Sequence, residues 1–123
     1  MTARTNTINA ATTHGWRPEV ELLLSCARAR VDVARAARIR ALVERELDWD
    51  YLLRLADRHG LQPLVHHHLD AVCANSVPVA HAERLREAAR RVAALNTFLS
   101  RELQRLLALF AAAGVEAMPY KGP

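Results

Sequence analysis

The fold is decided by residues 78–113, PVAHAERLREAARRVAALNTFLSRELQRLLALFAAA, in which no Gly or Pro follows Pro78. Side chains that can face a core recur there in two interleaved series. The series are Leu85, Val92, Leu99, Leu106 and Ala113, and Ala89, Asn96, Leu103 and Phe110. This spacing is typical of an amphipathic helix, and its length exceeds the ~11–12 residues of an average helix. We therefore predict a long helix over about 78–113. Its stripe is expected to be buried by shorter helices packed around it, with a coiled-coil dimer as the weaker alternative.

Shorter helices are predicted before this segment, with Pro and Gly at their boundaries. The first begins near Pro18 and the second covers about 32–46, although the pattern leaves open whether the two are separate. The third begins after an Asp48 N-cap and ends before Gly60, and the fourth begins at Pro63. The side chains expected to face the core are Val20, Leu23, Leu24, Ala27, Val31, Ala36, Ile39, Leu42, Val43, Leu52, Leu53, Leu55, Ala56, Leu64, Val65, Leu69 and Val72.

Composition supports a mainly α-helical chain with four or five helices and one domain. The 123 residues are 51% hydrophobic and include only 4 Gly, which excludes a wholly disordered chain and argues against a β-sandwich. The apolar runs are too short for a membrane span. Residues 1–17 are polar and are predicted to form a disordered tail, ahead of a helical domain at 18–113. Because Cys26 and Cys73 occur without a signal peptide, we expect free thiols in the cytoplasm.

Residues 114–123 do not continue the helical spacing of apolar residues. Val115 to Tyr120 alternates apolar and polar side chains, which predicts a short C-terminal β-strand, and Lys121-Gly122-Pro123 follows. A lone strand satisfies neither its backbone hydrogen bonds nor a buried face. We therefore expect the strand to join a partner's sheet, or the chain to be the front portion of a longer protein.

Several motifs together resemble the N-terminal helical region of the uncharacterised nucleotidyltransferase family, within the polymerase-β-like superfamily. The segments that carry the resemblance are Leu47-Asp48-Trp49-Asp50-Tyr51-Leu52-Leu53, Leu55-Ala56, His59-Gly60-Leu61-Gln62-Pro63-Leu64, Asn96, Glu102-Leu103, Leu106-Leu107 and Gly114-Val115 with Met118-Pro119-Tyr120-Lys121-Gly122. The resemblance spans about residues 18–123. Tyr120 departs from it, because a leucine is usual there.

The resemblance implies transfer of a nucleotidyl group from a nucleoside triphosphate by two carboxylate-bound Mg²⁺ ions. It assigns Lys121 and Gly122 to the turn that holds the triphosphate, and residues 114–123 to the first strand and turn of an incomplete catalytic fold. The paired strand carboxylates are not found in the chain, so we assign it no catalytic residue, metal ligand or cofactor of its own and expect it to be inactive alone. The nucleotide would bind only in the complete protein.

Two other groups of residues have a structural and a chemical interpretation. Asp48 and Asp50 have D-x-D spacing, but they lie at a predicted helix start, where capping explains them better. His66, Asp70 and Cys73 share one helix face at a spacing that suits Zn²⁺. A complete site needs further ligands, so we prefer solvent-facing or partly buried histidines with Asp70 as a helical partner.

Arginine supplies most of the net charge of +4, because Lys121 is the sole lysine among 17 basic residues. The long helix carries Arg84, Arg86, Arg90, Arg91, Arg101 and Arg105 among several Glu, and residues 28–45 carry Arg28, Arg30, Arg35, Arg38, Arg40 and Arg45. We expect a solvated, ion-paired face, with nucleic acid as a weak alternative. The expected partner is a downstream catalytic half or a second copy. The alternative function is a stand-alone helical interaction module.

Overall fold

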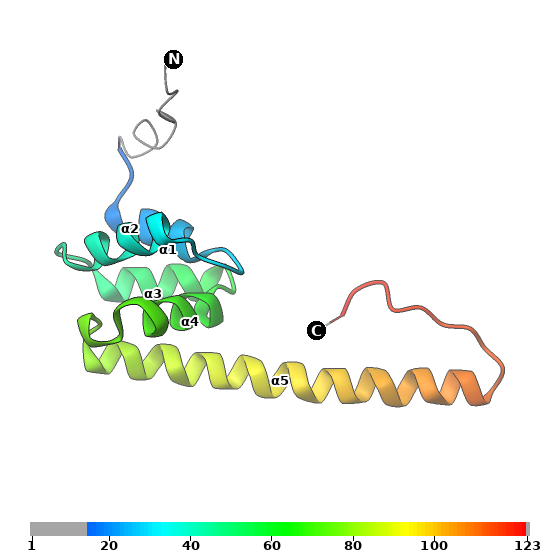
Figure 1. The fold of residues 1–123 in the computed structure, drawn as a ribbon. Helices are drawn as coiled ribbons and strands as arrows, with labels where there is room; N and C mark the ends of the chain where they lie inside the picture. The colour runs from blue at the N-terminus through cyan, green and yellow to red at the C-terminus, as the bar shows by residue number, and fades with distance from the viewer. Residues whose placement is uncertain (1–14, 123) are drawn as a thin grey trace, which may run out of the picture.

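The computed structural model describes residues 15–122, which form five α-helices and one short 3₁₀ turn (Figure 1). The helices are α1 (Pro18–Cys26), α2 (Val33–Val43), α3 (Trp49–Arg58), α4 (Gln62–Cys73) and α5 (Val79–Ala112), with the turn η2 (Ala74–Ser76) before α5. Helices α1 and α2 are separate, which settles the question that the sequence pattern left open. Most of the N-terminal segment predicted to be disordered, residues 1–14, lies outside the described residues.

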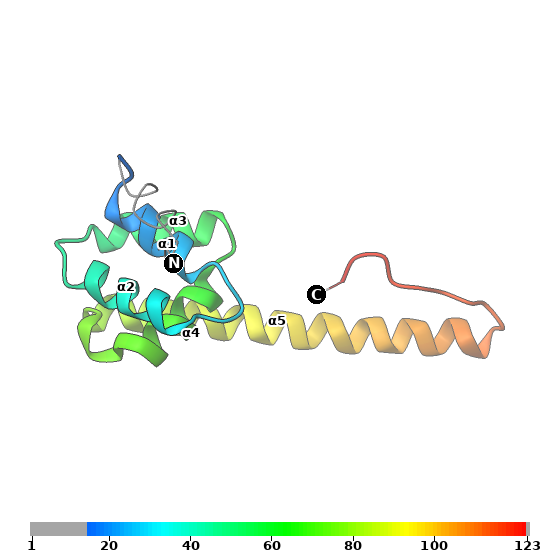
Figure 2. The same ribbon diagram turned by 45° about the horizontal axis from the view of Figure 1, so that its top comes forward.

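Four short helices form a compact head on the beginning of α5. Helices α3 and α4 contact α5, while α1 and α2 pack on the side of α3 and α4 that faces away from it (Figures 1 and 2). Thus the short helices do not surround the long one as predicted. The apolar core of the head consists of Leu22, Leu23, Cys26, Ile39, Leu42, Val43, Leu52, Leu53, Ala56, Val65, Leu69, Val77 and Leu85.

Local signals in the sequence place the ends of α3. The Asp48 carboxylate accepts a hydrogen bond from the Tyr51 backbone N–H at 2.9 Å, as the N-cap position requires. Gly60 has φ +66° and follows the helix, which confirms the predicted left-handed ending. One core assignment in α1 is wrong: Leu22 is fully buried, while Leu24 is 45% exposed. The face of this short helix is fixed by contacts from α2, α3 and α4.

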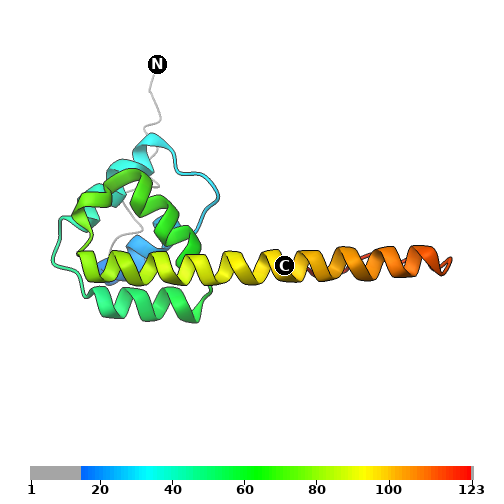
Figure 3. The ribbon, with the colours of Figure 1, turned by 90° about the horizontal axis from the view of Figure 1, so that it is seen from below.

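The predicted burial of the long stripe holds only for the first third of α5. Leu85 is buried and Val92 is partly buried, but from Ala93 onward no described residue of α5 is buried. We call residues 93–112 the α5 arm; it projects from the head into open space (Figures 2 and 3). The stripe is exposed along the arm because the head is too short to reach it.

The C-terminal strand predicted for residues 115–120 is wrong, since the described residues contain no strand. We call residues 113–122 the tail. Gly114, at φ +74°, ends α5, and the Val115 N–H donates to the Phe110 carbonyl at 2.8 Å. The tail then turns back along α5 (Figure 1). Beyond Val115 the tail makes no hydrogen bond with other described residues, because none of them offers a free strand edge.

Candidate functional site

Lys121 and Gly122, the residues assigned to a triphosphate-binding turn, are exposed near the end of the tail. A Cβ on Gly122 would lie 4.0 Å from Cδ2 of Leu103, so this end of the tail is beside the middle of the α5 arm. The apolar residues before them are also exposed, with Met118 at 90% and Tyr120 at 94%. An exposed Lys beside a Gly suits contact with a phosphate, because the ammonium supplies charge and the glycine permits close approach.

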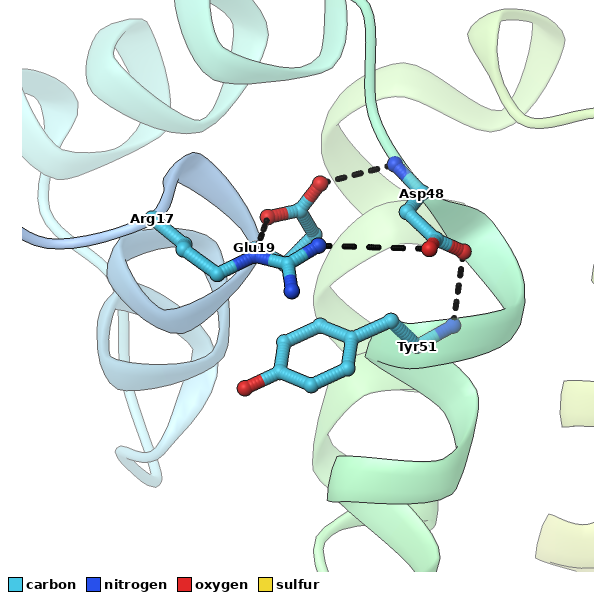
Figure 4. Close-up of polar contacts among 4 residues, drawn as sticks. All are labelled: Arg17, Glu19, Asp48 and Tyr51. Atoms are coloured by element: carbon cyan, nitrogen blue, oxygen red, sulfur yellow. Dashed lines mark hydrogen bonds and ion pairs between the residues drawn. The ribbon is translucent and has the colours of Figure 1, made fainter.

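A group of polar side chains in the head joins the start of α1 to the start of α3 (Figure 4). Glu19 is 3% exposed, and its carboxylate accepts from the Asp48 backbone N–H at 2.7 Å and from Arg17 Nε at 3.2 Å. Arg17 also lies 3.9 Å from the centre of the Tyr51 ring and 3.9 Å from the Asp48 carboxylate. This group is a latch between two helices, and it offers no free carboxylate for chemistry.

The pKa of Glu19 reflects opposing influences. Burial acts to raise it, but hydrogen bonds from the Asp48 and Glu19 backbone N–H groups and from Arg17, together with the Arg17 charge, lower the pKa below its ordinary value. The carboxylate is therefore held in its charged form. Such a group stabilises the fold in neutral solution.

Asp48 and Asp50 are not a metal-binding pair. Asp48 caps α3, whereas Asp50 accepts from Arg84 Nη1 on α5 at 2.7 Å and lies 3.4 Å from His81 Nε2. The hydrogen bond from Arg84 is the largest influence that lowers the pKa of Asp50. Asp50 thus fastens α3 to α5, which supports the structural interpretation of this motif.

The structure does not assemble His66, Asp70 and Cys73 into a zinc site. His66 and Asp70 line a cavity of about 320 Å³ between α4 and α5, while Cys73 packs against the apolar core of the head. Within residues 15–122, no three His, Cys, Asp or Glu side chains are grouped closely enough to hold a metal ion. The neighbouring His68 is buried and bonded to the Arg28 carbonyl oxygen at 2.5 Å.

A larger cavity of about 510 Å³ lies between α3 and α5, at the point where α5 leaves the head. Leu53, Leu85 and Ala88 form its apolar part, and charged side chains of both signs surround them. The charged residues in its lining are Arg54, Asp57, Glu83, Arg84, Glu87 and Arg91. Because the two signs are mixed, the cavity does not favour an anion.

The arginines of α5 agree in part with the predicted ion-paired face. Arg84, Arg86 and Arg105 pair with Asp50, Glu83 and Glu102, respectively. These pairs are exposed, and such pairs contribute little to stability. In residues 28–45, Arg38 pairs with Glu21 of α1.

Sequence reasoning missed the latch and the open face of the arm. The latch joins Glu19 to Asp48, which are 29 residues apart in the sequence, and no local pattern predicts such a contact. The open face had a signal, because the only charged residues among positions 92–113 are Arg101, Glu102 and Arg105. A helix with so few charges needs a partner along most of its length.

The comparisons with known proteins give one match. A family model described as uncharacterised nucleotidyltransferase matches residues 45–123, which include α3, α4, α5 and the tail. No curated protein and no solved structure matches the chain. No helix among residues 15–122 has both the length and the apolar character needed to cross a membrane.

Proposed function

The chain belongs to the uncharacterised nucleotidyltransferase family, and on this premise we propose that it forms the helical part of an enzyme that transfers a nucleotidyl group to an acceptor. The observation that carries the proposal is the extent of the family match, which includes Lys121 and Gly122 at its end. In this proposal the head is a folded support, α5 extends from it, and the tail brings Lys121 to the triphosphate.

The residues of the chain fit only part of this activity. An exposed Lys and its neighbouring Gly suit a phosphate group, but two residues do not enclose a triphosphate. The donor set for Mg²⁺ does not fit, because residues 15–122 contain no suitable group of carboxylates or other ligands. We therefore propose that the carboxylates and the rest of the nucleotide site come from a catalytic unit outside the described residues. No catalytic step is assigned to this chain.

The proposal is tested by titrating the chain with ATP and Mg²⁺, alone and with a catalytic unit from a member of the same family. We expect no binding up to millimolar ATP for the chain alone; a micromolar Kd would contradict the division of the site. With the catalytic unit, Lys121→Ala should lower kcat/KM about 10- to 100-fold, because the variant loses one hydrogen bond to a charged phosphate. Arg45→Ala, in the distant head, is the matched control and should change it less than twofold.

One observation favours a second candidate, an interaction module in which the helices themselves bind a partner. The α5 arm exposes large apolar side chains along one face, as docking helices do. The same titration separates the candidates, because a pure interaction module gives no Lys121-dependent transfer with any catalytic unit.

A further inference from the structure

The open face of the α5 arm carries large apolar side chains that no other described residue buries. Its six large apolar side chains are between 41% and 60% exposed. They are Leu95, Phe98, Leu99, Leu106, Leu109 and Phe110. At 100° per residue these positions lie along one side of the helix, and we call them the arm face.

The tail occupies a different side of the arm. Gly122 lies beside Leu103, which is only partly exposed. On a helical projection, Leu103 lies at one edge of the arm face and Arg105 at the other, and Glu102 lies between Arg105 and the middle of the face. The tail therefore leaves most of the arm face open.

From this arrangement we propose that the arm face binds the arm of a second copy of the chain, with the two α5 helices antiparallel. Glu102 and Arg105 are paired within one arm at 2.9 Å and lie near the middle of the apolar series. In an antiparallel pair, the same edge of each helix meets along one side. If the helices cross between residues 103 and 104, Glu102 of one copy lies level along the axis with Arg105 of the other.

The charges favour this orientation over a parallel pair. A parallel pair would bring the side with Glu102 and Arg105 against the opposite edge of the second helix, which carries Asn96 and Leu103. No charge would then face Glu102. In the antiparallel pair Glu102 of each copy meets Arg105 of the other, so these two polar pairs near the centre specify both register and direction.

The area of the arm face is sufficient for a dimer. Six large apolar side chains that are each about half exposed present about 600 Å² per copy, taking roughly 200 Å² for a whole side chain of this kind. A pair of arms would then bury about 1,200 Å² in total, which is the lower end of stable protein interfaces. We therefore expect a dimer that dissociates on dilution. This inference does not depend on nucleotidyl transfer.

The first test measures molar mass by light scattering during size exclusion, over a range of chain concentrations. We expect a mass approaching twice 13.7 kDa at 100 µM and falling on dilution. The double change Leu99→Glu with Leu106→Glu should raise the dissociation constant at least tenfold. The control is Ala93→Glu with Ala108→Glu, two exposed positions on the opposite side of the arm, which should leave the dimer intact. Helical circular dichroism establishes that all variants are folded.

The second test exchanges charge between two copies. Glu102→Arg places an arginine at both positions 102 and 105, and Arg105→Glu places a glutamate at both. Each variant alone should be monomeric at concentrations where the natural chain is dimeric. An equal mixture should recover a dimer, because opposite charges then face each other between the copies. The two like charges within each arm still repel one another, so the recovery reports contact between copies. A monomeric natural chain at 100 µM, or a mixture that remains monomeric, would overturn the proposal.

Discussion

Removing the Glu19 carboxylate should destabilise the head, because this group connects α1 to α3 from a nearly dry position. Glu19→Ala removes the acceptor of the Asp48 N–H and the partner of Arg17. A hydrogen bond to a charged group contributes about 1.5–3 kcal/mol. Since Arg17 is half exposed, its ion pair adds less than about 1 kcal/mol. We expect Glu19→Ala to lower the free energy of unfolding by about 2–3 kcal/mol.

Glu19→Gln separates the charge from the shape of the side chain. Its amide oxygen can still accept from the Asp48 N–H, so we expect a loss of about 1 kcal/mol. The assay is urea unfolding at pH 7, followed by tryptophan fluorescence to which Trp49 of α3 contributes. Glu46→Gln is the control, because Glu46 is exposed and makes no hydrogen bond with other described residues. It should change stability by less than about 0.5 kcal/mol.

The pH dependence gives an independent check on Glu19. Its pKa is lower in the folded chain than the ordinary value of 4.5. Its charge therefore contributes fully to stability above pH 4.5, and the contribution is lost as the pH falls through the folded pKa. The difference between the natural chain and Glu19→Gln should shrink in acid. The reasoning fails if Glu19→Ala matches the Glu46→Gln control, or if the difference grows as the pH is lowered.

Three further changes test the fold. Leu52→Ala, at a fully buried position of α3, should cost about 2–5 kcal/mol in urea unfolding, whereas Val33→Ala, at an exposed position, should cost less than about 0.5. Gly60→Ala should cost about 1–2 kcal/mol from its positive φ alone, because the added Cβ meets no atom within 4 Å; a neutral result would refute this. Burial raises the pKa of the Cys26 thiol to about 12, so iodoacetamide at pH 8 should label Cys73 first by mass spectrometry, and equal rates would contradict the burial.

The local features of this fold were accessible from sequence. Asp48, Gly60 and Gly114 mark helix ends through their own backbone and side-chain preferences, and the structure places all three where expected. The length of α5 followed from the uninterrupted stretch after Pro78. These features depend on neighbouring residues only, which is why pattern and propensity are sufficient for them.

The errors concern contacts that a local pattern does not contain. Periodicity identified the apolar stripe of α5, but it could not show that the head ends before Leu99. The alternation after Gly114 indicated a strand, but a strand forms only when another strand bonds to it. Similarly, Arg17 was assigned to a disordered N-terminal segment, although it contacts Glu19 across the start of α1. In each case a distant partner decides the outcome.

For the candidate site, sequence patterns favoured structural roles over metal binding. For Asp48, the predicted cap was confirmed by its bond to Tyr51. His66, Asp70 and Cys73 share a helix face in sequence, but they have different surroundings because the core of the head takes Cys73. The role of Lys121 and Gly122 came from the resemblance alone and stays a prediction.

Because α5 projects beyond the head, the hydrogen exchange of its backbone amides can show where a partner binds. Amides of residues 93–112 are closed mainly by bonds inside their own helix, and a helix of about 20 residues in water opens at small cost. Amides in the head open only with larger portions of its core. In deuterium the arm should therefore exchange much faster than α3 or α4. Whatever covers the arm face will slow that exchange, so the rate profile along α5 maps the footprint of its partner without any label.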